Sequence, residues 1–402
     1  MRPLTARLLP SPGHVDLLDV AGDDGHFFES SHAAVAGRGE AIRLDLSYNR
    51  SSIGVALARI AHTLSNLETH DGATPLAFVS IPFVDTLPIL AVVPEFTVQV
   101  DPDGNRTTIA VHVDRPGVAP AFAPPLPLEV PRHFSVAAAR SPKEWCDSVD
   151  EAISRLRSGR IDKVVLARQL VVEADAPLSQ YAILDRLRTA YPSAFRYALN
   201  GFVGASPELL LERRGSDIRS QPMAGTVARG SGPESDQAVR SGLLRSEKDL
   251  SEHRFLVDMV RETLQPYCTD LVAPTSPDVV SLANVHHLAT AISGRLTTPM
   301  NVLDLVAALH PTPAVGGRPT EEALAVIAEL EELDRGRYAG AIGWVDANGD
   351  GCFAVAIRCA QLEGNRALLF AGNGIVAESD SQRELEETRA KFQAMLTAII
   401  RP

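Results

Sequence analysis

The first part of the chain alternates short apolar runs with polar turns. Two runs rich in aliphatic and β-branched residues, PLAFVSIPFV (75–84) and PILAVVPEFTVQV (88–100), predict strands, and the turn DPDGN follows the second. GVALARIAHTLSNLE (54–68) repeats its apolar residues at helical spacing, so we expect an amphipathic helix there. Residues 1 to about 112 are therefore expected to alternate strands and helices.

A proline-rich stretch follows this part. DRPGVAPAFAPPLPLEVPRHF, from Asp114 to Phe134, has the composition of a linker or an extended surface strap rather than of a packed element. We expect residues 1–135 to form the N-terminal part of a sheet scaffold plus this connection. Residues 136–402 are expected to form the catalytic region, with one structural domain overall.

The pattern changes after the connection. SPKE, Ser141–Glu144, is a capping box with proline at the first helical position, and its helix is expected to end at Gly159. A strand from Asp162 to Val172 and a helix in SQYAILDRLRTAYP come next, and FRYALNGFVGASPELLLERR predicts two strands joined around its Gly-Ala-Ser-Pro turn. Hairpin turns in DANGDG and EGNR favour an α+β fold with a mixed, largely antiparallel sheet over a doubly wound parallel one.

Composition narrows the class of protein. The chain has 402 residues, 45% hydrophobic and 22% charged, which suits a globular enzyme with a large core. Its net charge of −12 argues against nucleic acid as a partner, because phosphate binding needs a basic patch. We expect no signal peptide and no membrane span. The four cysteines form no C-x-x-C motif and are expected to be reduced and mostly buried in a cytoplasmic protein.

Two side chains inside apolar strands could transfer protons. Lys163 lies in IDKVVLARQLVV, where period-two alternation places it with Val165 and Ala167 on one face of a strand that is apolar on both faces. A desolvated lysine has a lowered pKa and can act as a neutral base; the alternative is a lysine that reaches solvent or pairs with Asp162. Glu208, at the mouth of the strand ELLLE, should have a raised pKa and can donate a proton; the alternative is a salt-bridged glutamate.

Two acidic segments carry carboxylates at helical spacing. Asp249 and Glu252 share a face in SEKDLSEHRFLVD, and Glu384, Glu387 and Lys391 share a face in RELEETRAK. Carboxylate pairs on separate helices could converge on Mg²⁺, which suits few protein carboxylates completed by substrate oxygens and waters. Two solvated helices with ordinary intrahelical ion pairs are the alternative.

Further residues could hold an anion or shape a pocket. Arg358, which ends the strand FAVAIR, could clamp a carboxylate through two hydrogen bonds, or lie on the surface of an edge strand. His287 in VHHLAT could orient a substrate oxygen or be a packed residue, and Ala314 and Val315 of HPTPAVGGRP could form a pocket wall. The glycine turns PMAGTV and FAGNGIV could present bare backbone N–H groups to an anion, at Gly225, Thr226, Gly372 and Gly374.

Taken in order, ten segments resemble the chorismate-utilising enzymes, and most closely isochorismate synthase. They span roughly residues 140 to 400 and read DKVVLARQL, GASPELLLE, PMAGTVARG, LLRSEKDLSEHRFLVD, HHLAT, LHPTPAVGG, DRGRYAGAIGWVD, AIRCAQL, FAGNGIVAESD and ELEETRAKFQAML. The resemblance implies a large single domain in which two antiparallel sheets pack face to face, with helices outside and the active site in a cleft at one end. This is the anthranilate synthase component I-like fold.

The resemblance also implies a reaction, the conversion of chorismate to isochorismate. Lys163 would activate a water for attack at C2, and Glu208 would protonate the departing C4 hydroxyl. Mg²⁺ would be held by carboxylates of two helices, Glu252 and Glu387 directly, and Asp249 and Glu384 through water. The remaining residues would hold the substrate carboxylates or support the site: Tyr338, Arg358, the backbone at Gly225 and Gly374, Lys391 and His287.

Two positions separate the activities within this family. Anthranilate synthases, which use ammonia, typically lack lysine where Lys163 stands, and amine-forming and salicylate-forming relatives tend to have threonine where this chain has Ala314. Lysine with alanine points to isochorismate as the released product, with no amidotransferase subunit. The alternatives are a salicylate synthase, which adds pyruvate elimination, and a non-catalytic chorismate-binding relative.

Other details of the sequence bear on partners and loops. FFESS stands where feedback-regulated anthranilate synthases have a Leu-Leu-Glu-Ser motif, and FAGNG has asparagine where alanine or glycine is usual in the family. We expect a monomer or weak dimer. Its product could serve menaquinone, catechol siderophore or salicylate synthesis.

Overall fold

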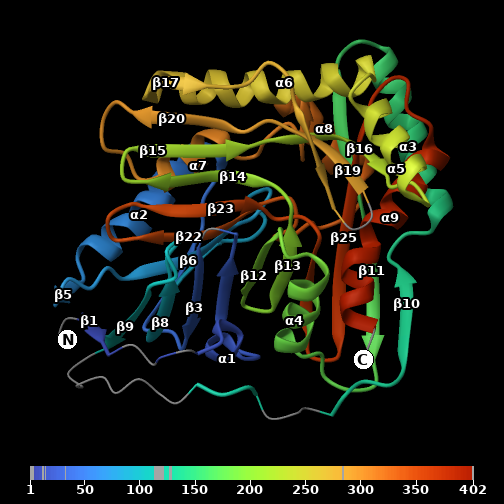
Figure 1. The fold of residues 1–402 in the computed structure, drawn as a ribbon. Coiled ribbons are helices and arrows are strands. Elements are labelled where there is room, and N and C mark those ends of the chain that lie inside the picture. Colours follow the sequence, from blue (N-terminus) through green and yellow to red (C-terminus); the bar gives the residue numbers. More distant parts are fainter. Residues whose placement is uncertain are drawn as a thin grey trace.

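The computed structural model describes residues 4–10, 13, 15–31, 33–112, 122–125, 129–282 and 285–400. Much of the connection from Asp114 to Phe134 lies outside the described residues, so its course as a linker or strap stays a prediction. The described part forms two large sheets, a small third sheet and helices that surround them (Figure 1).

The larger sheet collects strands from both halves of the chain. Its described strands run in the order β10 (Phe134–Ala138), β11 (Lys163–Ala174), β25 (Arg366–Ile375), β24 (Cys359–Glu363), β13 (Phe202–Ser206), β12 (Phe195–Leu199), β2 (His26–Glu29), β3 (Ala34–Arg38), β8 (Phe96–Val100), β9 (Arg106–His112), β1 (Thr5–Leu9) and β5 (Glu68–His70), with β21 (Gly317–Arg318) also paired to β11. Neighbours pair antiparallel except β1 with β5.

The second sheet is antiparallel and mixes the two halves in the same way. Its order is β17 (Cys268–Val272), β20 (Ile292–Leu296), β15 (Asp217–Gln221), β14 (Leu209–Arg214), β23 (Gly351–Val355), β22 (Ala341–Asp346), β6 (Leu76–Ile81), β7 (Ile89–Val93) and β4 (Ile42–Leu46). A small sheet holds β16 (Met223–Ala228), β19 (Val285–Ala289) and β18 (Asp278–Ser281). The N-terminal strands therefore extend both large sheets built by the C-terminal ones.

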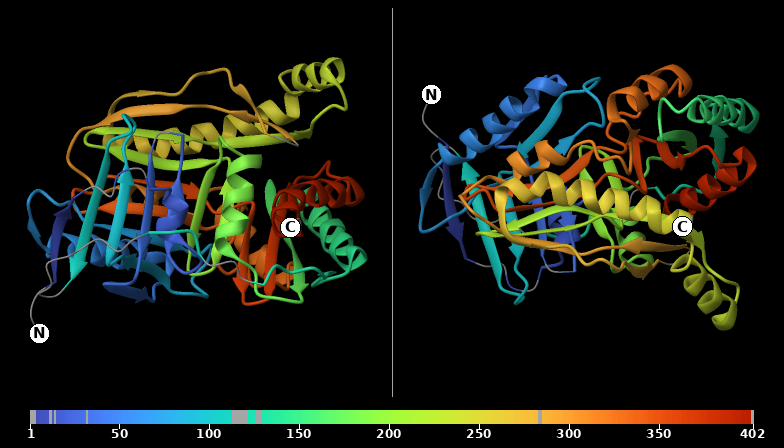
Figure 2. Two further views of the ribbon diagram at one scale, coloured as in Figure 1. Left: turned by 60° about the horizontal axis from the view of Figure 1, so that its bottom comes forward. Right: turned by 90° about the horizontal axis from the view of Figure 1, so that it is seen from above.

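Helices cover the outer faces of the sheets (Figure 1, Figure 2). Against the larger sheet lie α1 (Leu17–Ala21), α4 (Gln180–Ala190) and α9 (Ser381–Ile400); against the second lie α2 (Ile53–Ser65), preceded by η1 (Arg50–Ser52), and α7 (Val302–Leu309). The end of the sheet at β11 carries α3 (Pro142–Arg157) and α8 (Thr320–Leu330). The small sheet carries α5 (Pro233–Leu243) and α6 (Glu247–Leu264), and η2 (Gln265–Tyr267) follows α6.

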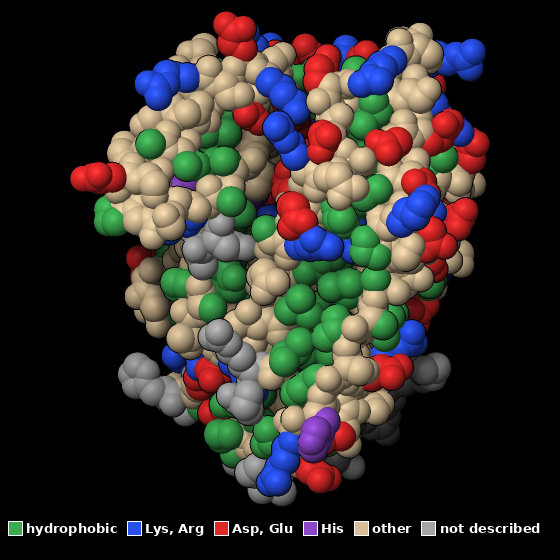
Figure 3. Space-filling view, turned by 90° about the vertical axis from the view of Figure 1, so that its right-hand side faces the viewer, with side chains coloured by type: hydrophobic (Ala, Val, Ile, Leu, Met, Phe, Trp, Pro, Cys, Tyr) green, Lys and Arg blue, Asp and Glu red, His purple; other side chains and the backbone are tan. Residues whose placement is uncertain are grey.

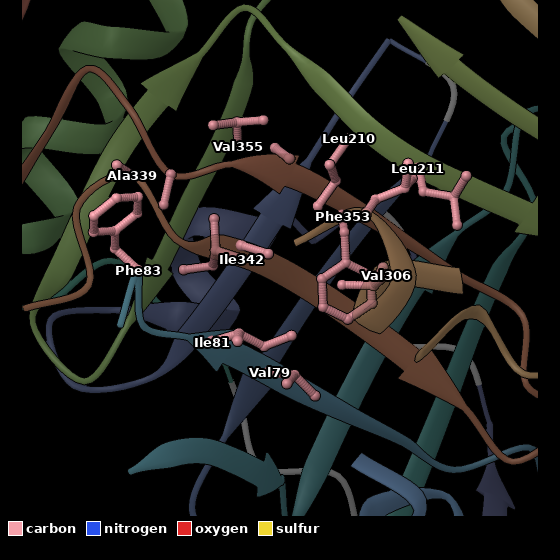
Figure 4. Packing of buried hydrophobic residues seen from close by; sticks show 14 of the residues in the cluster. Val79, Ile81, Phe83, Leu210, Leu211, Val306, Ala339, Ile342, Phe353 and Val355 are labelled. Carbon is pink, nitrogen blue, oxygen red and sulfur yellow. The ribbon is translucent and has the colours of Figure 1, made fainter. Parts of the chain in front are cut away.

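Side-chain alternation explains why the larger sheet is buried on both faces. In β2, Phe28 packs into the core between the two sheets, whereas Phe27 packs into the cluster formed with α1 and α4. Each is at most 2% exposed, and burying a phenylalanine stabilises the fold by roughly 1.5–3 kcal/mol. On the second sheet, Phe353 lies beside Val306 of α7 (Figure 4). The predicted α+β fold of two packed, mainly antiparallel sheets is confirmed.

Local signals in the sequence account for one helix boundary. Ser141 Oγ accepts a hydrogen bond from Glu144 N, and the Glu144 carboxylate accepts one from Ser141 N, so the predicted capping box is confirmed. The helix α3 ends at Arg157, and Gly159 follows with a φ of +75°, a conformation that favours glycine. Such caps need only neighbouring residues, which is why the sequence predicts them.

Two strand predictions each gave one strand too few. PILAVVPEFTVQV forms two strands, β7 and β8, which lie in different sheets on either side of Pro94. FRYALNGFVGASPELLLERR forms three strands: β12 and β13 join at Asn200–Gly201, and the chain then leaves the larger sheet at Pro207 to begin β14 in the second. Proline lacks an N–H to donate to a ladder, and it marks both changes of sheet.

The surface and the cysteines agree with the composition. All four cysteines are buried and free of disulfides. Within the part of the chain that the structure describes, no helix is long and apolar enough to cross a membrane. Figure 3 shows one face on which Lys, Arg, Asp and Glu side chains are interspersed around a band of hydrophobic side chains. This face therefore carries no continuous basic patch of the kind that nucleic acid requires.

Candidate active site

The candidate residues meet at a cavity, which forms where the chain passes twice from one large sheet to the other. β13 gives way to β14 at Pro207 and Glu208, and β23 gives way to β24 at Ile357 and Arg358. Each crossing is hydrogen-bonded through its backbone to a strand beside the other crossing. Val355 N, at the end of β23, donates to Glu208 O (3.1 Å), and Ala205 N, in β13, donates to Arg358 O (3.0 Å). Both side chains therefore leave the ladders at the same end of the molecule.

A cavity of about 200 Å³ lies at this point. Its wall contains every candidate residue from the sequence: Lys163, Glu208, Gly225, Thr226, Asp249, Glu252, His287, Ala314, Val315, Tyr338, Arg358, Gly372, Gly374, Glu384, Glu387 and Lys391. They come from both large sheets, the small sheet, two helices and the loop before α8. The structure brings these residues together; their roles are taken up below as proposals.

Glu208 is a buried carboxyl group with little to stabilise its charge. It is 5% exposed, and burial raises its pKa to about 7, although the nearby Lys163 and Arg358 act in the opposite direction. The one hydrogen bond that its carboxyl group receives from a described residue is a long contact from Met223 N, at 3.5 Å. Near neutral pH a large fraction of Glu208 is therefore protonated and can donate a proton into the cavity.

Arg358 is a buried guanidinium that faces the same cavity. It is 9% exposed, and burial lowers its pKa from the ordinary value. Its backbone has a φ of +54°, an uncommon conformation for an arginine, at the crossing between β23 and β24. Among the described residues its guanidinium donates no hydrogen bond, so a bound anion would satisfy it.

Lys163 does not stand alone as a desolvated amine. Its Nζ lies 2.5 Å from Glu252 Oε1, and the side chain is 13% exposed. Burial alone would raise the pKa of Glu252, but the pairing with Lys163 lowers it below the usual range. An acid on α6 thus provides a counter-charge that the strand sequence could not reveal, and the role of Lys163 as a base stays a prediction.

A second lysine, Lys391, pairs with a carboxylate on the other helix, α9. Lys391 Nζ lies 2.6 Å from Glu387 Oε1, four residues earlier on α9. The carboxylates expected to bind a metal directly, Glu252 and Glu387, are therefore each paired with an ammonium group. Both carboxylates face the cavity, and each already pairs with a lysine ammonium group there. They therefore suit a hard, oxygen-preferring ion such as Mg²⁺.

The other two carboxylates differ in their surroundings. Glu384 accepts hydrogen bonds from Ser379 Oγ (2.8 Å) and Asn373 Nδ2 (2.9 Å), and burial, with repulsion from Glu387, raises its pKa. Asp249 lies beside Gly225, where an added Cβ would approach its Cβ to 3.1 Å. Within the described residues, no three His, Cys, Asp or Glu side chains are gathered as closely as a metal site requires. The carboxylates share the cavity wall but are not preassembled around one point.

The predicted glycine turns are parts of strands instead. Gly372 and Gly374 lie in β25 and pair with Ala167 and Val165, while Gly225 lies at an irregularity of β16 with a φ of +74°. At position 374 any side chain would collide with Lys163, because an added Cβ would lie 2.5 Å from its Cε. This glycine therefore gives the lysine room to pass into the cavity.

A buried ion pair between Arg335 and Glu331 supports the part of the cavity wall that contains Val315 and Tyr338. Arg335 donates to Glu331 Oε1 (2.6 Å) and also to the backbone oxygens of Val165 (2.7 Å) and Val315 (2.9 Å). Tyr338, three residues further on, stacks on Phe370 with ring centroids 5.4 Å apart. The loop therefore holds Val315 and Tyr338 in place. The sequence did not single out this pair, and its i, i+4 spacing of Glu and Arg is the only local signal.

His287 and Thr226 face each other across the small sheet. His287 Nδ1 lies 3.0 Å from Thr226 Oγ1, and burial lowers the pKa of His287 well below its ordinary value, so the imidazole is neutral. Lys248 and Met223 also line the cavity, although the sequence did not indicate them. Lys248 is exposed and stands next to Asp249, so a cation beside a carboxylate pair was the available signal.

A larger cavity of about 420 Å³ lies on the other side of the wall that Arg335 supports. Phe370, Arg335 and Glu331 line it. Its buried pair, Arg335 and Glu331, is closed upon itself, with both side chains 2% exposed. The smaller cavity is the better candidate, because it holds a carboxyl group with a raised pKa and a guanidinium without a partner among the described residues.

The comparisons with known proteins agree with this geometry. Residues 123–400 match the family model "Chorismate binding enzyme". A Mycobacterium tuberculosis protein named "Putative isochorismate synthase MenF" is 45% identical over 286 residues, which cover 67% of this chain and 77% of that protein.

Solved structures have the same fold. MenF, the menaquinone-specific isochorismate synthase of Escherichia coli, matches with a TM-score of 0.80 at 23% identity, over 99% of this chain and 94% of that one. Anthranilate synthase component I of Streptococcus pneumoniae matches with a TM-score of 0.72 at 23% identity, over 96% and 95%. At 23% identity the two structures show the fold alone. With the family match and the relative at 45% identity, they lead to one conclusion: this chain is a member of the chorismate binding enzyme family.

Proposed function

We propose that this protein converts chorismate to isochorismate, with water adding at C2 as the C4 hydroxyl leaves. The observation that carries the proposal is the state of Glu208, a buried carboxyl group with a pKa of about 7 that opens onto the cavity. A hydroxyl group leaves far more easily as water than as hydroxide, so the reaction needs an acid that is still protonated near neutral pH. Glu208 meets that requirement.

Lys163 is the proposed base for the attacking water. It enters the cavity from β11, while Glu208 enters from the crossing between β13 and β14, so the two groups come from different segments of the chain. In the structure the amine is paired with Glu252, so it must give up this partner before it can accept a proton. A lysine without a counter-ion in a buried site loses its proton more readily, which suits this role.

The charge of the substrate explains the remaining residues. Chorismate carries two carboxylates, and Arg358, with the backbone near Gly225 and Gly374 and the Tyr338 hydroxyl, would bind them. Lys391 and His287 would support these contacts. Bound at Glu252 and Glu387, with Asp249 and Glu384 reached through water, Mg²⁺ would offset the repulsion between the helix carboxylates and the dianionic substrate. Ala314 and Val315 would close the side of the pocket.

Water as the nucleophile has consequences for partners and location. No ammonia is consumed, so we expect no amidotransferase subunit. The four free, buried cysteines suit a reducing, cytoplasmic compartment. These expectations follow from the proposed reaction and the composition together.

The test is incubation of the purified protein with chorismate and Mg²⁺, followed by chromatographic identification of the products. We expect isochorismate without stoichiometric pyruvate, and no turnover after chelation with EDTA. Salicylate formed together with pyruvate would instead assign a salicylate synthase. Full activity in EDTA would refute the metal, and absence of any product would refute the proposed function.

A further inference from the structure

Asn373 occupies a position next to the proposed metal site that none of the proposed roles uses. It lies in β25 between Gly372 and Gly374, is 2% exposed, and pairs with Leu166 of β11. Because side chains alternate along a strand, Asn373 points to the face opposite its two glycine neighbours, toward α9.

The amide of Asn373 makes three hydrogen bonds with α9. Its Nδ2 donates to the backbone oxygen of Glu384 (2.7 Å) and to Glu384 Oε2 (2.9 Å), while its Oδ1 accepts from Lys391 Nζ (2.7 Å). The reverse orientation would place the NH₂ group against an ammonium and the oxygen against a carboxylate. The neighbouring charges therefore admit a single orientation of the amide.

Lys391 is held by three groups. Its ammonium donates hydrogen bonds to Gly372 O (2.9 Å) and Asn373 Oδ1 (2.7 Å) and forms an ion pair with Glu387 Oε1 (2.6 Å). Two of the three acceptors belong to β25, so the strand holds the lysine in place. The lysine in turn holds Glu387 toward the cavity.

The two carboxylates on α9 are consequently held in different ways. Glu387 is held by a cation, which a metal ion would have to replace, whereas Glu384 is held by neutral donors from Asn373 and Ser379. A carboxylate oriented by neutral donors keeps its charge and its orientation when a cation arrives. This is the arrangement expected of a group that acts on a metal from the second shell of ligands.

We propose that Asn373 is a positioning residue that sets Glu384 and Lys391 on α9 at the geometry needed for Mg²⁺ to bind. The proposal rests on the proposed function for the identity of the metal. Asn373 itself does not line the cavity; it acts through Glu384 and Lys391, which do.

The test measures binding of Mg²⁺ alone to the full chain by isothermal titration calorimetry. Asn373→Ala should weaken Mg²⁺ binding by about 10- to 100-fold, the usual effect of removing an outer partner of a metal ligand. At saturating Mg²⁺ its kcat with chorismate should return to within about threefold of the parent value, because affinity is lost rather than chemistry. Asn365→Ala is the matched control, since Asn365 also makes a side-chain bond at β25, to Ala174 O (2.9 Å), and should bind Mg²⁺ as the parent does.

A double-mutant cycle separates positioning from packing. If Asn373 acts largely through Glu384, Asn373→Ala should cost much less Mg²⁺ affinity in a Glu384→Gln background than in the parent. Equal losses in both backgrounds, or parental affinity in Asn373→Ala, would overturn the proposal and leave the proposed function intact. A parent chain that binds no Mg²⁺ would refute the metal assignment and this proposal with it.

Discussion

Two glutamates on one cavity wall, Glu208 and Glu252, have opposite electrostatic environments. Glu208 is 5% exposed and the Glu252 side chain is 24% exposed, yet the pKa of Glu208 is raised to about 7 and that of Glu252 is lowered. Burial disfavours the charged form of each, so burial alone cannot lower the pKa of Glu252. The difference is one contact: Lys163 Nζ lies 2.5 Å from Glu252, whereas no cationic side chain that the structure describes bonds to the Glu208 carboxyl group.

The comparison teaches how one cavity can supply both an acid and a cation site. Glu208 is placed by a crossing between sheets, where no helix brings a lysine against it. Glu252 and Glu387 are placed by helices, whose side chains meet lysines from β11 and from their own helix. A paired lysine therefore separates Glu252 from Glu208 within one cavity.

The largest expected effect comes from removing either proton-transfer group. Glu208→Gln and Lys163→Gln should each lower kcat/KM for chorismate by about 10² to 10⁴, the usual range for loss of a general acid or base. Steady-state kinetics with isochorismate detection would measure it. Glu212→Gln is a matched control from the neighbouring strand β14, since Glu212 is buried but pairs with Arg214. If both variants turned over like the parent, Lys163 and Glu208 would not be the proton-transfer groups; a parent without turnover would instead favour a non-catalytic chorismate-binding protein.

The second-largest expected effect is the dependence of the free energy of unfolding on pH. Glu208 has a folded-state pKa of about 7, above its unfolded value of about 4.5, so the folded state binds the extra proton between these limits. Stability is fully present below about pH 4.5 and falls as pH rises toward 7 and beyond. At about 1.4 kcal/mol for each pH unit between the two values, the loss is about 3 kcal/mol.

Glu208→Gln removes this loss, because glutamine is neutral at every pH. Its free energy of unfolding should match that of the parent near pH 5 and exceed it by up to about 3 kcal/mol at pH 9. Urea denaturation at both pH values would measure the difference. A constant difference across pH would mean that Glu208 is ionised in the folded protein throughout, and the contrast with Glu252 would disappear.

The smallest effect tests the lysine pairing directly. Lys163→Met removes the ammonium that a metal would have to displace from Glu252, so Mg²⁺ should bind about tenfold more tightly, a gain of about 1.4 kcal/mol. Calorimetry measures this binding without any turnover. Lys143→Met serves as control, because Lys143 pairs with Asp147 on the exposed face of α3. Weaker or unchanged Mg²⁺ binding in Lys163→Met would contradict the view that Lys163 competes for the metal ligand.

Several features followed from neighbouring residues alone. The capping box at Ser141, the hairpin in DANGDG and the shared face of Glu384, Glu387 and Lys391 need only local geometry, and the sequence predicted them. The boundary at Pro94 did not follow, and at Pro207 the turn was predicted but the change of sheet was not, because an apolar run continues across a proline whether or not the chain changes sheets. That choice depends on partner strands distant in sequence.

The sequence by itself determined which chemical groups this protein brings to its site: a lysine and a glutamate in apolar strands, carboxylates on two helices, and an arginine at a strand end. Only the tertiary structure decided their states. It paired Lys163 with Glu252, left the Glu208 carboxyl group without a bond to any cationic side chain among the described residues, and placed Asn373 between Glu384 and Lys391. The reason is physical: pKa values and ion pairs depend on burial and on distances between residues far apart in the chain, and those distances exist only once both sheets have packed.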